Sequence, residues 1–203
     1  PMRLSPVHKA KLQDILEDLI DKGRIERSSS AWTSPVFLVP KGNKGEVRLV
    51  CDYRYLNSQA QEETYSLPKI QELLADLHGA RVFSTLDLKD GYWQLHVHPD
   101  SRDLLAISTP LGTWRWISMP MGLHNASSLF QLYLEGIFNN MPHVYIYQDD
   151  VLIATETQEE QEAVLHQVIE VLAKHDLTVK PSKMHLCKDE VEVLGFIVGK
   201  GII

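Results

Sequence analysis

Apolar residues recur at the spacing of an α-helix in four parts of the chain. In the clearest part, residues 12–20, apolar side chains fall at positions i, i+3, i+4, i+7 and i+8. Ser5-Pro6 precedes this stretch and Gly23 follows it, and such residues commonly begin and end a helix. The four predicted helices begin after Ser5, after Ser66, at Asn125 and at the capping box Thr157-Gln158-Glu159-Glu160.

Runs of β-branched and aromatic residues between these helices predict strands. Residues 36–39 and 47–50 flank a turn rich in glycine and lysine, so they predict a hairpin with a basic tip. Residues 81–88 predict a strand with Asp87 at its polar end. The remaining strand patterns predict a hairpin over residues 143–155 and a single strand over residues 191–198.

The order of these elements from residue 81 onward is strand, helix, strand, strand, helix, strand. This order is the split βαβ, ferredoxin-like arrangement. Right-handed crossovers then place the strand of Asp87 beside the hairpin at residues 143–155. We therefore expect an α+β chain in which residues 81–203 form mainly one ferredoxin-like sheet with its helices.

The hairpin at residues 143–155 has two adjacent acids at its bend, within Tyr147-Gln148-Asp149-Asp150. Neighbouring carboxylates repel each other unless one is protonated or a cation bridges them, and Mg²⁺ prefers such hard oxygen ligands. Aspartates are also ordinary turn-forming residues, and Asp87 alone is a plain strand-ending residue. Each motif on its own therefore leaves a structural interpretation open.

The predicted strand order brings Asp87 to the same edge of the sheet as Asp149 and Asp150. Three acids that converge there can bind two divalent cations. In-line displacement at phosphorus uses one ion to activate the attacking oxygen and another to stabilise the leaving group. The arrangement predicts phosphoryl transfer, with these three aspartates as metal ligands.

The composition limits how the chain can bind nucleic acid and membranes. Of 203 residues, 44% are hydrophobic, which is ample for a core, and the formal net charge is −7. Residues 1–60 nevertheless contain ten Lys and Arg against seven Asp and Glu, so basic character is concentrated there. No stretch approaches the roughly 18 consecutive apolar residues of a membrane span, and the first residues lack the apolar core of a signal peptide. We expect no membrane partner and no secretion.

Several motifs resemble, in the same order, those of the reverse transcriptases of gypsy-type long-terminal-repeat retrotransposons and their retroviral relatives. They lie at residues 50–57, 83–94, 119–126, 147–150, 181–183 and 193–196, and so cover nearly the whole chain. The resemblance implies a right-hand polymerase with its fingers mainly in residues 1–80 and its palm mainly in residues 81–203. It also implies that the thumb is absent and that a thumb and an RNase H domain belong to the rest of the polyprotein.

The resemblance assigns catalytic roles to individual residues. Asp87 and Asp149 match the principal metal ligands and Asp150 the second aspartate of the hairpin, which implies two Mg²⁺ ions, with Mn²⁺ as an alternative. Lys183 matches a lysine proposed to donate a proton to the leaving pyrophosphate. The strand at residues 191–198 resembles the segment that steadies the primer end.

Further residues match the family's nucleotide pocket. Tyr92 matches the aromatic residue under the sugar of the incoming nucleotide, whose ring disfavours a 2′-hydroxyl. Lys41 and Arg48 match the pair that binds the triphosphate, Arg as a bidentate fork and Lys as a point charge. Met121 and Gln148 border the same pocket.

Three residues depart from the usual pattern of this family. Gln148 takes a position that is more often apolar, Met121 replaces a commoner Phe or Gln, and Ser127 stands where a proline usually follows Asn-Ala. Each departure touches the surroundings of the expected site without removing a catalytic group. They are expected to alter fidelity or nucleotide handling, or to mark drift in an element no longer under selection.

The implied function is that of an RNA-directed DNA polymerase domain of a retroelement polyprotein. It would extend a primer on an RNA or DNA template with deoxynucleoside triphosphates, in the cytoplasm or within virus-like particles. One alternative is a domesticated or degenerate element that acts as a non-catalytic structural or binding subunit. Another is a generic metal-dependent nuclease or phosphatase, which explains the carboxylates but not the basic hairpin.

Overall fold

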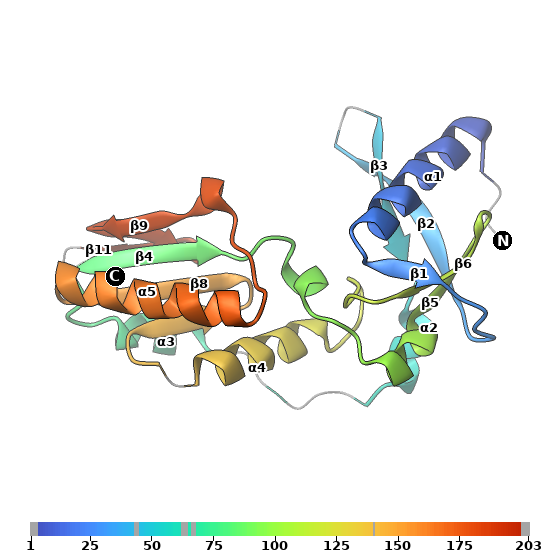
Figure 1. The fold of residues 1–203 in the computed structure, drawn as a ribbon. Coiled ribbons are helices and arrows are strands. Elements are labelled where there is room, and N and C mark those ends of the chain that lie inside the picture. The colour runs from blue at the N-terminus through green and yellow to red at the C-terminus, as the bar shows by residue number, and fades with distance from the viewer. Residues whose placement is uncertain (1–3, 43–44, 62–64, 66–67, 140, 200–203) are drawn as a thin grey trace. The chain divides into compact units, whose positions relative to one another are not determined.

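The computed structural model describes residues 4–42, 45–61, 65, 68–139 and 141–199. They form two compact units, each built from two segments of the chain (Figure 1). Unit 1 consists of Pro1–Glu63 and Leu95–Ala126, and unit 2 consists of Thr64–Gln94 and Ser127–Ile203. Unit 2 thus begins at residue 64, and the chain returns to unit 1 for residues 95–126.

Unit 1 contains a five-stranded sheet in the order β1-β6-β5-β2-β3. Strands β2 and β5 are parallel, with Ser34 opposite Ile107, and the other pairs are antiparallel. Because β5 and β6 lie between β1 and β2, the sheet needs both segments of the chain, which is the physical reason for the discontinuous unit. The strands are β1 (Ile25–Arg27), β2 (Ser34–Lys41), β3 (Glu46–Cys51), β5 (Ala106–Thr109) and β6 (Gly112–Trp116).

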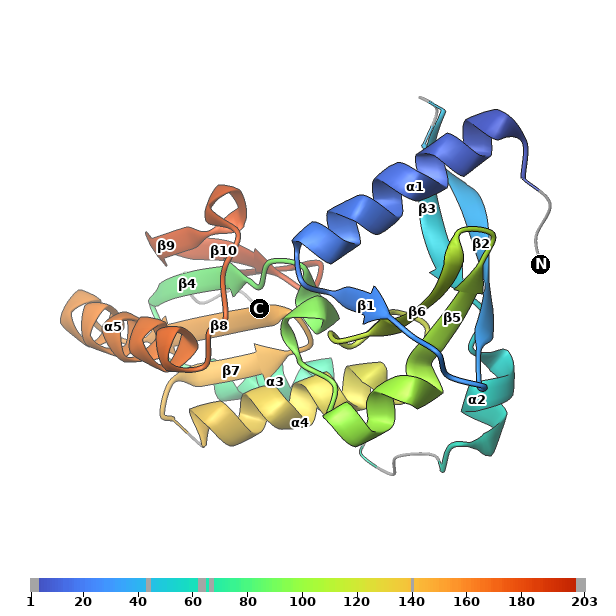
Figure 2. The same cartoon turned by 45° about the vertical axis from the view of Figure 1, so that its right-hand side comes forward.

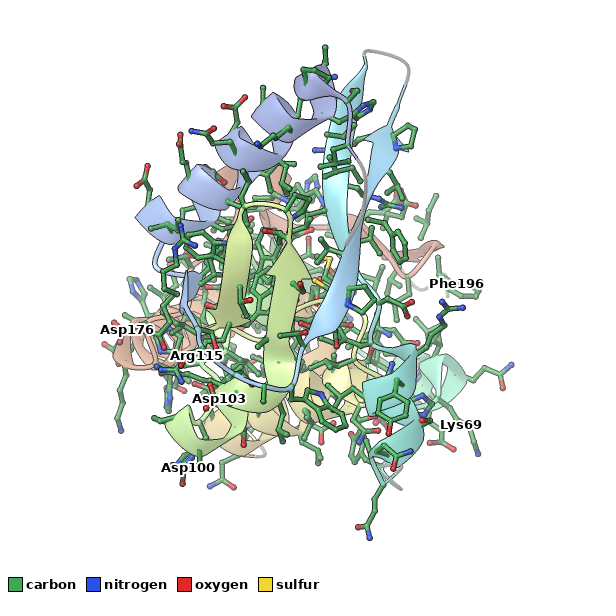
Figure 3. All side chains as sticks on the ribbon, turned by 90° about the vertical axis from the view of Figure 1, so that its right-hand side faces the viewer. Lys69, Asp100, Asp103, Arg115, Asp176 and Phe196 are labelled. Atoms are coloured by element: carbon green, nitrogen blue, oxygen red, sulfur yellow. The ribbon has the colours of Figure 1, made fainter. Side chains whose placement is uncertain are left out.

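Ion pairs with Glu26 also join the two segments of unit 1, near the labelled Arg115 and Asp103 in Figure 3. Arg115 donates to Glu26 Oε1 at 2.9 Å and to Asp103 Oδ1 at 2.7 Å. Arg102 lies 3.5 Å from the same oxygen of Glu26. Partly exposed pairs of this kind contribute only about 0–1 kcal/mol each. The sheet and its apolar core therefore carry most of the stability of unit 1.

The first predicted helix is confirmed as α1 (Pro6–Asp21), which lies along the sheet of unit 1 (Figure 2). Ser5 caps it, since the Ser5 Oγ accepts a hydrogen bond from the backbone N–H of His8 at 3.3 Å. The leucines of its apolar stripe are buried, whereas Ile15 is half-buried and Ile20 is exposed. The buried residues of this stripe are Leu12, Leu16 and Leu19. The other helices of unit 1 are α2 (Arg54–Gln59) and the 3₁₀ helix η2 (Pro99–Leu105).

Unit 2 contains a four-stranded antiparallel sheet in the order β7-β8-β4-β9. Helix α4 (Ala126–Phe138) lies in sequence between β4 and β7, and α5 (Gln158–Lys174) lies between β8 and β9. The predicted ferredoxin-like order is confirmed, and β4 is paired with the second strand of the hairpin β7–β8. The strands are β4 (Val82–Asp87), β7 (Val144–Tyr147), β8 (Asp150–Thr155) and β9 (His185–Lys188).

The two faces of this sheet are covered by different elements, because successive side chains of a strand point to opposite faces. On one face, Gln161 of α5 donates to Ser84 Oγ at 2.7 Å. On the other face, Phe83 belongs to an apolar core shared with α3 (Ile70–Asp76) and with two further strands, β10 and β11. Helix α4 runs beside β7 (Figure 2).

The prediction of a single strand over residues 191–198 is wrong. These residues form a hairpin of β10 (Glu190–Val193) and β11 (Phe196–Gly199), separate from the four-stranded sheet. Leu194 and Gly195 form its turn with φ of 53° and 82°, and two successive positive φ angles suit a tight hairpin. A leucine gives no sign of such a turn in the sequence. The fourth strand of the sheet is β9, which the prediction missed.

Two further predicted helices of unit 2 are present as α3 and α5. Helix α3 begins at Ile70, and its predicted cap, Ser66, lies outside the described residues. Thr157 caps α5 as predicted, accepting a hydrogen bond from the N–H of Glu160 at 3.3 Å. Two short 3₁₀ helices complete unit 2, η1 (Gly91–Gln94) and η3 (Pro181–Lys183). In the part of the chain that the structure describes, no helix has both the length and the apolar character to cross a bilayer.

Candidate active site

Two of the three predicted carboxylates lie opposite each other on neighbouring strands of unit 2. In the antiparallel pairing of β4 with β8, Asp87 is the direct partner of Asp150. Directly opposed residues point to the same face of a sheet, with Cβ atoms about 4.5–5.5 Å apart. Both side chains therefore emerge on the face that also carries Phe83. The predicted placement of Asp87 beside the aspartate hairpin is confirmed.

The third carboxylate, that of Asp149, lies in the two-residue turn between β7 and β8, because Tyr147 pairs with Asp150. The other turn residue, Gln148, has a φ of 53°. This left-handed conformation is unfavourable for most residues other than glycine. The N–H of Leu88 donates to the Asp149 carbonyl at 3.0 Å. The turn is thus bonded directly to the chain that leaves β4.

A glycine leaves room for the Asp149 carboxylate. Gly91 is the first residue of η1 and has a φ of 46°. A Cβ atom on Gly91 would lie 3.0 Å from Asp149 Oδ2, which is tighter than an ordinary van der Waals contact. A larger residue at this position would therefore press on the carboxylate as well as strain the backbone.

Gln131, which the sequence reasoning missed, holds the turn from within the core. It is fully buried on α4. Its Oε1 accepts from the N–H of Gln148 at 2.7 Å, and its Nε2 donates to the Ile146 carbonyl at 2.9 Å. The sequence carried one indication of this role. Gln131 interrupts the apolar stripe between Phe130 and Leu134, where a polar side chain needs a buried partner.

Two lysines lie beside Asp87. Lys183 Nζ is 2.7 Å from Asp87 Oδ2, and Lys180 Nζ is 4.0 Å from Asp87 Oδ1. The hydrogen bond to Asp87, followed by the charge of that carboxylate, raises the pKa of Lys183 above its ordinary value. Lys183 is therefore a cation throughout the neutral pH range.

Burial and mutual repulsion raise the pKa of both acids of the hairpin. For Asp149, burial is the largest cause of the raised pKa and the charge of Asp87 is the second, while Lys180 and Lys183 act in the opposite direction. For Asp150, the pKa is raised by burial and then by the charges of Asp87 and Asp149. Carboxylates in such surroundings are stabilised in their ionised form by a cation, and they are common at functional sites.

The oxygen atoms of these acids suit a divalent cation. Asp149 Oδ1 is buried and has no hydrogen-bond partner among the described residues, so it remains free to accept a ligand. Within the described ranges, no group of three or more His, Cys, Asp or Glu side chains is arranged to hold a metal ion. Mg²⁺ usually binds through one or two carboxylates and completes its shell with water and substrate phosphates. The residues therefore fit Mg²⁺ that enters together with a phosphate group, and they do not form a closed cage.

Tyr92 lies directly after Gly91, and α4 fixes its ring. The hydroxyl of Tyr92 shares a hydrogen bond of 2.8 Å with Ser127 Oγ. The ring of Phe130 meets the tyrosine ring edge-on, with centroids 5.5 Å apart. Ser127, one of the departures from the usual family pattern, thus has a defined contact with a residue of the predicted nucleotide pocket.

Three predicted site residues belong to unit 1. Lys41 and Arg48 lie on the hairpin β2–β3, which is confirmed as predicted. Val39 is opposite Arg48 and Glu46 is opposite Lys41, so the two basic residues share one face as diagonal neighbours. Both are exposed, as is Met121. The other predicted site residues all belong to unit 2, where the structure brings the aspartates and Lys183 together.

A pocket of about 250 Å³ opens beside Asp87 and Asp150. It lies on the sheet face that the β10–β11 hairpin covers. This hairpin contains most of the segment that was predicted to steady the primer end. The other residues that line it are Thr85, Val151, Leu152, Ser182, Lys183, His185, Glu192 and Val193. The carboxylates are therefore open to a ligand from this face.

The sheet order defines an α+β domain of ferredoxin-like type with acids at one edge of its sheet. Residues 39–198 match the sequence profile of the family described as reverse transcriptase (RNA-dependent DNA polymerase). The match includes well over half of the residues of this chain, so the chain belongs to the reverse transcriptase family. The predicted family resemblance is confirmed.

Polyproteins of viruses and retrotransposons are similar along nearly the whole chain. The enzymatic polyprotein of Figwort mosaic virus (strain DxS) is 30% identical over 205 residues, which cover 99% of this chain and 31% of the polyprotein. The retrovirus-related Pol polyprotein from transposon gypsy of Drosophila melanogaster is 35% identical over 193 residues, covering 91% of this chain and 19% of the polyprotein. The chain thus spans less than a third of the length of these relatives.

Solved structures of foamy viral protease-reverse transcriptase have the same fold. The structure in complex with an RNA/DNA hybrid matches with a TM-score of 0.85 and 27% identity, over 98% of this chain and 27% of that chain. The structure in complex with double-stranded DNA matches with a TM-score of 0.84 and 27% identity, over 98% of this chain and 41% of that chain. The predicted right-hand polymerase fold is therefore confirmed.

Proposed function

We propose that this chain catalyses RNA-directed DNA synthesis by joining deoxynucleotides to the 3′-hydroxyl of a primer. The observation that carries the proposal is the group of Asp87, Asp149 and Asp150 at one edge of the sheet, in a member of the reverse transcriptase family. Phosphoryl transfer needs positioning and charge neutralisation more than covalent help from the protein. A group of neighbouring carboxylates that favours a cation meets that need.

The three aspartates would hold the divalent cations, with Mg²⁺ as the expected ion and Mn²⁺ as an alternative. When bound, the cations activate the attacking oxygen and stabilise the leaving group. Asp149 supports this role through its buried oxygen without a hydrogen-bond partner. Lys183 supports it as a cation 2.7 Å from Asp87 Oδ2, and we infer that it would stabilise the leaving pyrophosphate and donate a proton to it.

Nucleotide binding would use the residues that match the family's nucleotide pocket. We infer that Lys41 and Arg48 bind the triphosphate and that Tyr92 lies under the sugar and disfavours a 2′-hydroxyl. Met121 and Gln148 would each contact the incoming nucleotide. Support comes from the shared face of the two basic residues on the exposed hairpin and from the fixed ring of Tyr92.

The expected macromolecular partner is a primed RNA or DNA template. Foamy viral relatives have been solved with an RNA/DNA hybrid and with double-stranded DNA. We infer that this chain binds such duplexes and acts with a thumb and an RNase H domain of a polyprotein. Because its net charge is −7, its own binding should be weak. That binding would depend on contacts of lysine and arginine with phosphates, so it should fall steeply as salt is added.

Primer extension on an RNA template with Mg²⁺ tests the proposal. Asp149→Asn should lower kcat about 10³-fold, since electrostatic stabilisation by a bound ion amounts to several kcal/mol. Asp100→Asn is a matched control, because its side chain is 91% exposed in unit 1, and it should retain wild-type kcat. Equal extension by the wild-type chain and Asp149→Asn would exclude this catalytic role. Duplex binding without extension would favour a binding subunit, and RNA hydrolysis without incorporation would indicate a nuclease.

A further inference from the structure

The turn that carries Asp149 depends on one side chain from another element. Gln131 Oε1 accepts from the N–H of Gln148, and Gln131 Nε2 donates to the Ile146 carbonyl. The same Nε2 donates to Glu135 Oε1 at 2.9 Å, and Glu135 in turn accepts from the hydroxyl of Tyr65. Both amide hydrogens of Gln131 therefore have acceptors. The amide cannot rotate by half a turn without losing all of these bonds.

The bonds from Gln131 lie at the part of the turn where the backbone is strained. Gln148 has a positive φ, and a residue other than glycine keeps such a conformation only where its surroundings hold it. Gln131 bonds to the strained residue itself and to the strand residue two positions before it. It thus fixes the backbone on the entry side of Asp149, while the N–H of Leu88 fixes the Asp149 carbonyl.

We propose that Gln131 is a positioning residue of the candidate active site. By holding the backbone of Gln148, it keeps the carboxylate of Asp149 against Gly91 and next to the Asp87–Asp150 pair. This inference rests on the proposed polymerase function, because the position of Asp149 matters only if that carboxylate takes part in the reaction. A displacement of about 1 Å in a catalytic group can cost on the order of 10²-fold in rate.

The first test compares Gln131→Leu with the wild-type chain in primer extension, below the melting temperature of both proteins. Leucine has a similar volume and no polar atom, so it removes the bonds without a large cavity. We expect kcat to fall about 10- to 100-fold, with the KM for the deoxynucleotide changed less than kcat. Equal kcat in the two proteins would overturn the inference.

A second buried glutamine provides the matched control. Gln161 on α5 is also fully buried, and it donates to the Ile153 carbonyl of β8 at 3.2 Å and to Ser84. It bonds to the same hairpin but not to the turn. Gln161→Leu should therefore lower stability while kcat stays close to the wild-type value. A similar loss of kcat in both glutamine variants would mean that any buried bond has this effect, and the inference would fail.

Replacement of Gln148 by glycine tests the mechanism of the effect. Glycine adopts a positive φ without strain, so the turn should then need Gln131 less. We expect Gln131→Leu to cost clearly less in the Gln148→Gly background than in the wild-type background, which is a non-additive result. An equal cost in both backgrounds would contradict a role through the turn backbone.

Hydrogen exchange of the Gln148 amide separates this inference from the proposed function. The amide should exchange slowly in the wild-type chain and in Gln161→Leu, and quickly in Gln131→Leu. If the wild-type chain extends no primer, the proposed function fails, and the exchange data alone then decide whether Gln131 holds the turn. Fast exchange in the wild-type chain would overturn the inference.

Discussion

Two hairpins carry most of the candidate chemistry, and their surroundings differ. Strand β8 of the aspartate hairpin lies between β7 and β4, and its residues from Val151 to Thr155 are all buried. Strand β3 of the basic hairpin lies at the edge of its sheet, with exposed and half-buried residues in alternation. The turn of the first hairpin is bonded by Leu88 and Gln131.

The buried hairpin suits the binding of cations, and the exposed hairpin suits the binding of a triphosphate. Carboxylates that bind cations must be in place before the substrate arrives, because a displaced ligand cannot stabilise the transition state. Lysine and arginine side chains reach a triphosphate from a distance and are better placed on an exposed strand. We therefore expect damage to the aspartate hairpin to appear mainly in kcat and damage to the basic hairpin mainly in KM.

The largest effect is expected for Asp87→Asn, which should lower kcat about 10³-fold through loss of a metal ligand. The KM for the deoxynucleotide should change much less. Steady-state primer extension gives both constants. Asp176→Asn, which removes another aspartate of the same unit, is the control and should leave both unchanged. A rise in KM with unchanged kcat would show that Asp87 acts in substrate binding and not in the chemical step.

Arg48→Ala is expected to have a smaller effect, which should appear in KM and not in kcat. Hydrogen bonds to charged groups contribute about 1.5–3 kcal/mol, so KM should rise about 10- to 100-fold with little change in kcat. Arg48→Lys should recover only part of the loss, since lysine lacks the bidentate fork. Lys22→Ala removes an exposed cation of the same unit as a control. If the control raises KM equally, general charge and not the hairpin binds the triphosphate.

Ser127→Ala is expected to change nucleotide selection modestly. It removes the hydrogen bond to the Tyr92 hydroxyl, and a neutral bond of this kind contributes about 0.5–1.5 kcal/mol. The preference for deoxynucleotides over ribonucleotides should therefore fall about 2- to 10-fold. Tyr92→Phe should produce the same change, and the two substitutions together should add nothing. Additive losses would show that the two side chains act separately.

The smallest expected effect is a gain in stability. The raised pKa of Asp149 means that the folded chain binds a proton more readily than the unfolded chain, so stability falls as pH rises from 3.8 through the raised pKa. Asp149→Asn lacks this penalty and should melt about 1–3 °C higher at pH 7 without divalent cations. Thermal melts at decreasing pH should show the difference shrinking. A variant less stable at pH 7 would mean that the lysines outweigh burial.

Local patterns predicted the three central elements of unit 2, which are the strand of Asp87 and the two strands of the aspartate hairpin. A strand ending in Asp87 and a hairpin with two acids at its bend are each visible within a few residues, and the order of elements then fixes their pairing. The return of residues 95–126 to unit 1 was not predictable in this way. It depends on the parallel pairing of Ser34 with Ile107 across more than seventy residues, and parallel strands leave no local turn signature.

Two errors have a common physical origin. Leu194 and Gln148 both have positive φ, and neither residue type indicates such a backbone. At Leu194 the consequence was a hairpin predicted as one strand. At Gln148 the consequence was that the contact with Gln131 was not predicted. Gln131 accepts from a backbone N–H, and every residue except proline has one, so the sequence does not mark the partner. In this chain, backbone conformations that depend on tertiary contacts could not be predicted from the sequence.

The interruption of unit 2 by the second segment of unit 1 has a consequence for synthesis on the ribosome. Unit 1 has all its strands once Ala126 has emerged, whereas β4 gains its partners only when β8 and β9 are made. At about 5–20 residues per second, β4 waits for several seconds with both edges unpaired. Its apolar residues Phe83 and Leu86 are exposed to other nascent chains during that time. Chaperones that act at this stage should therefore raise the yield of soluble protein more than those added after release.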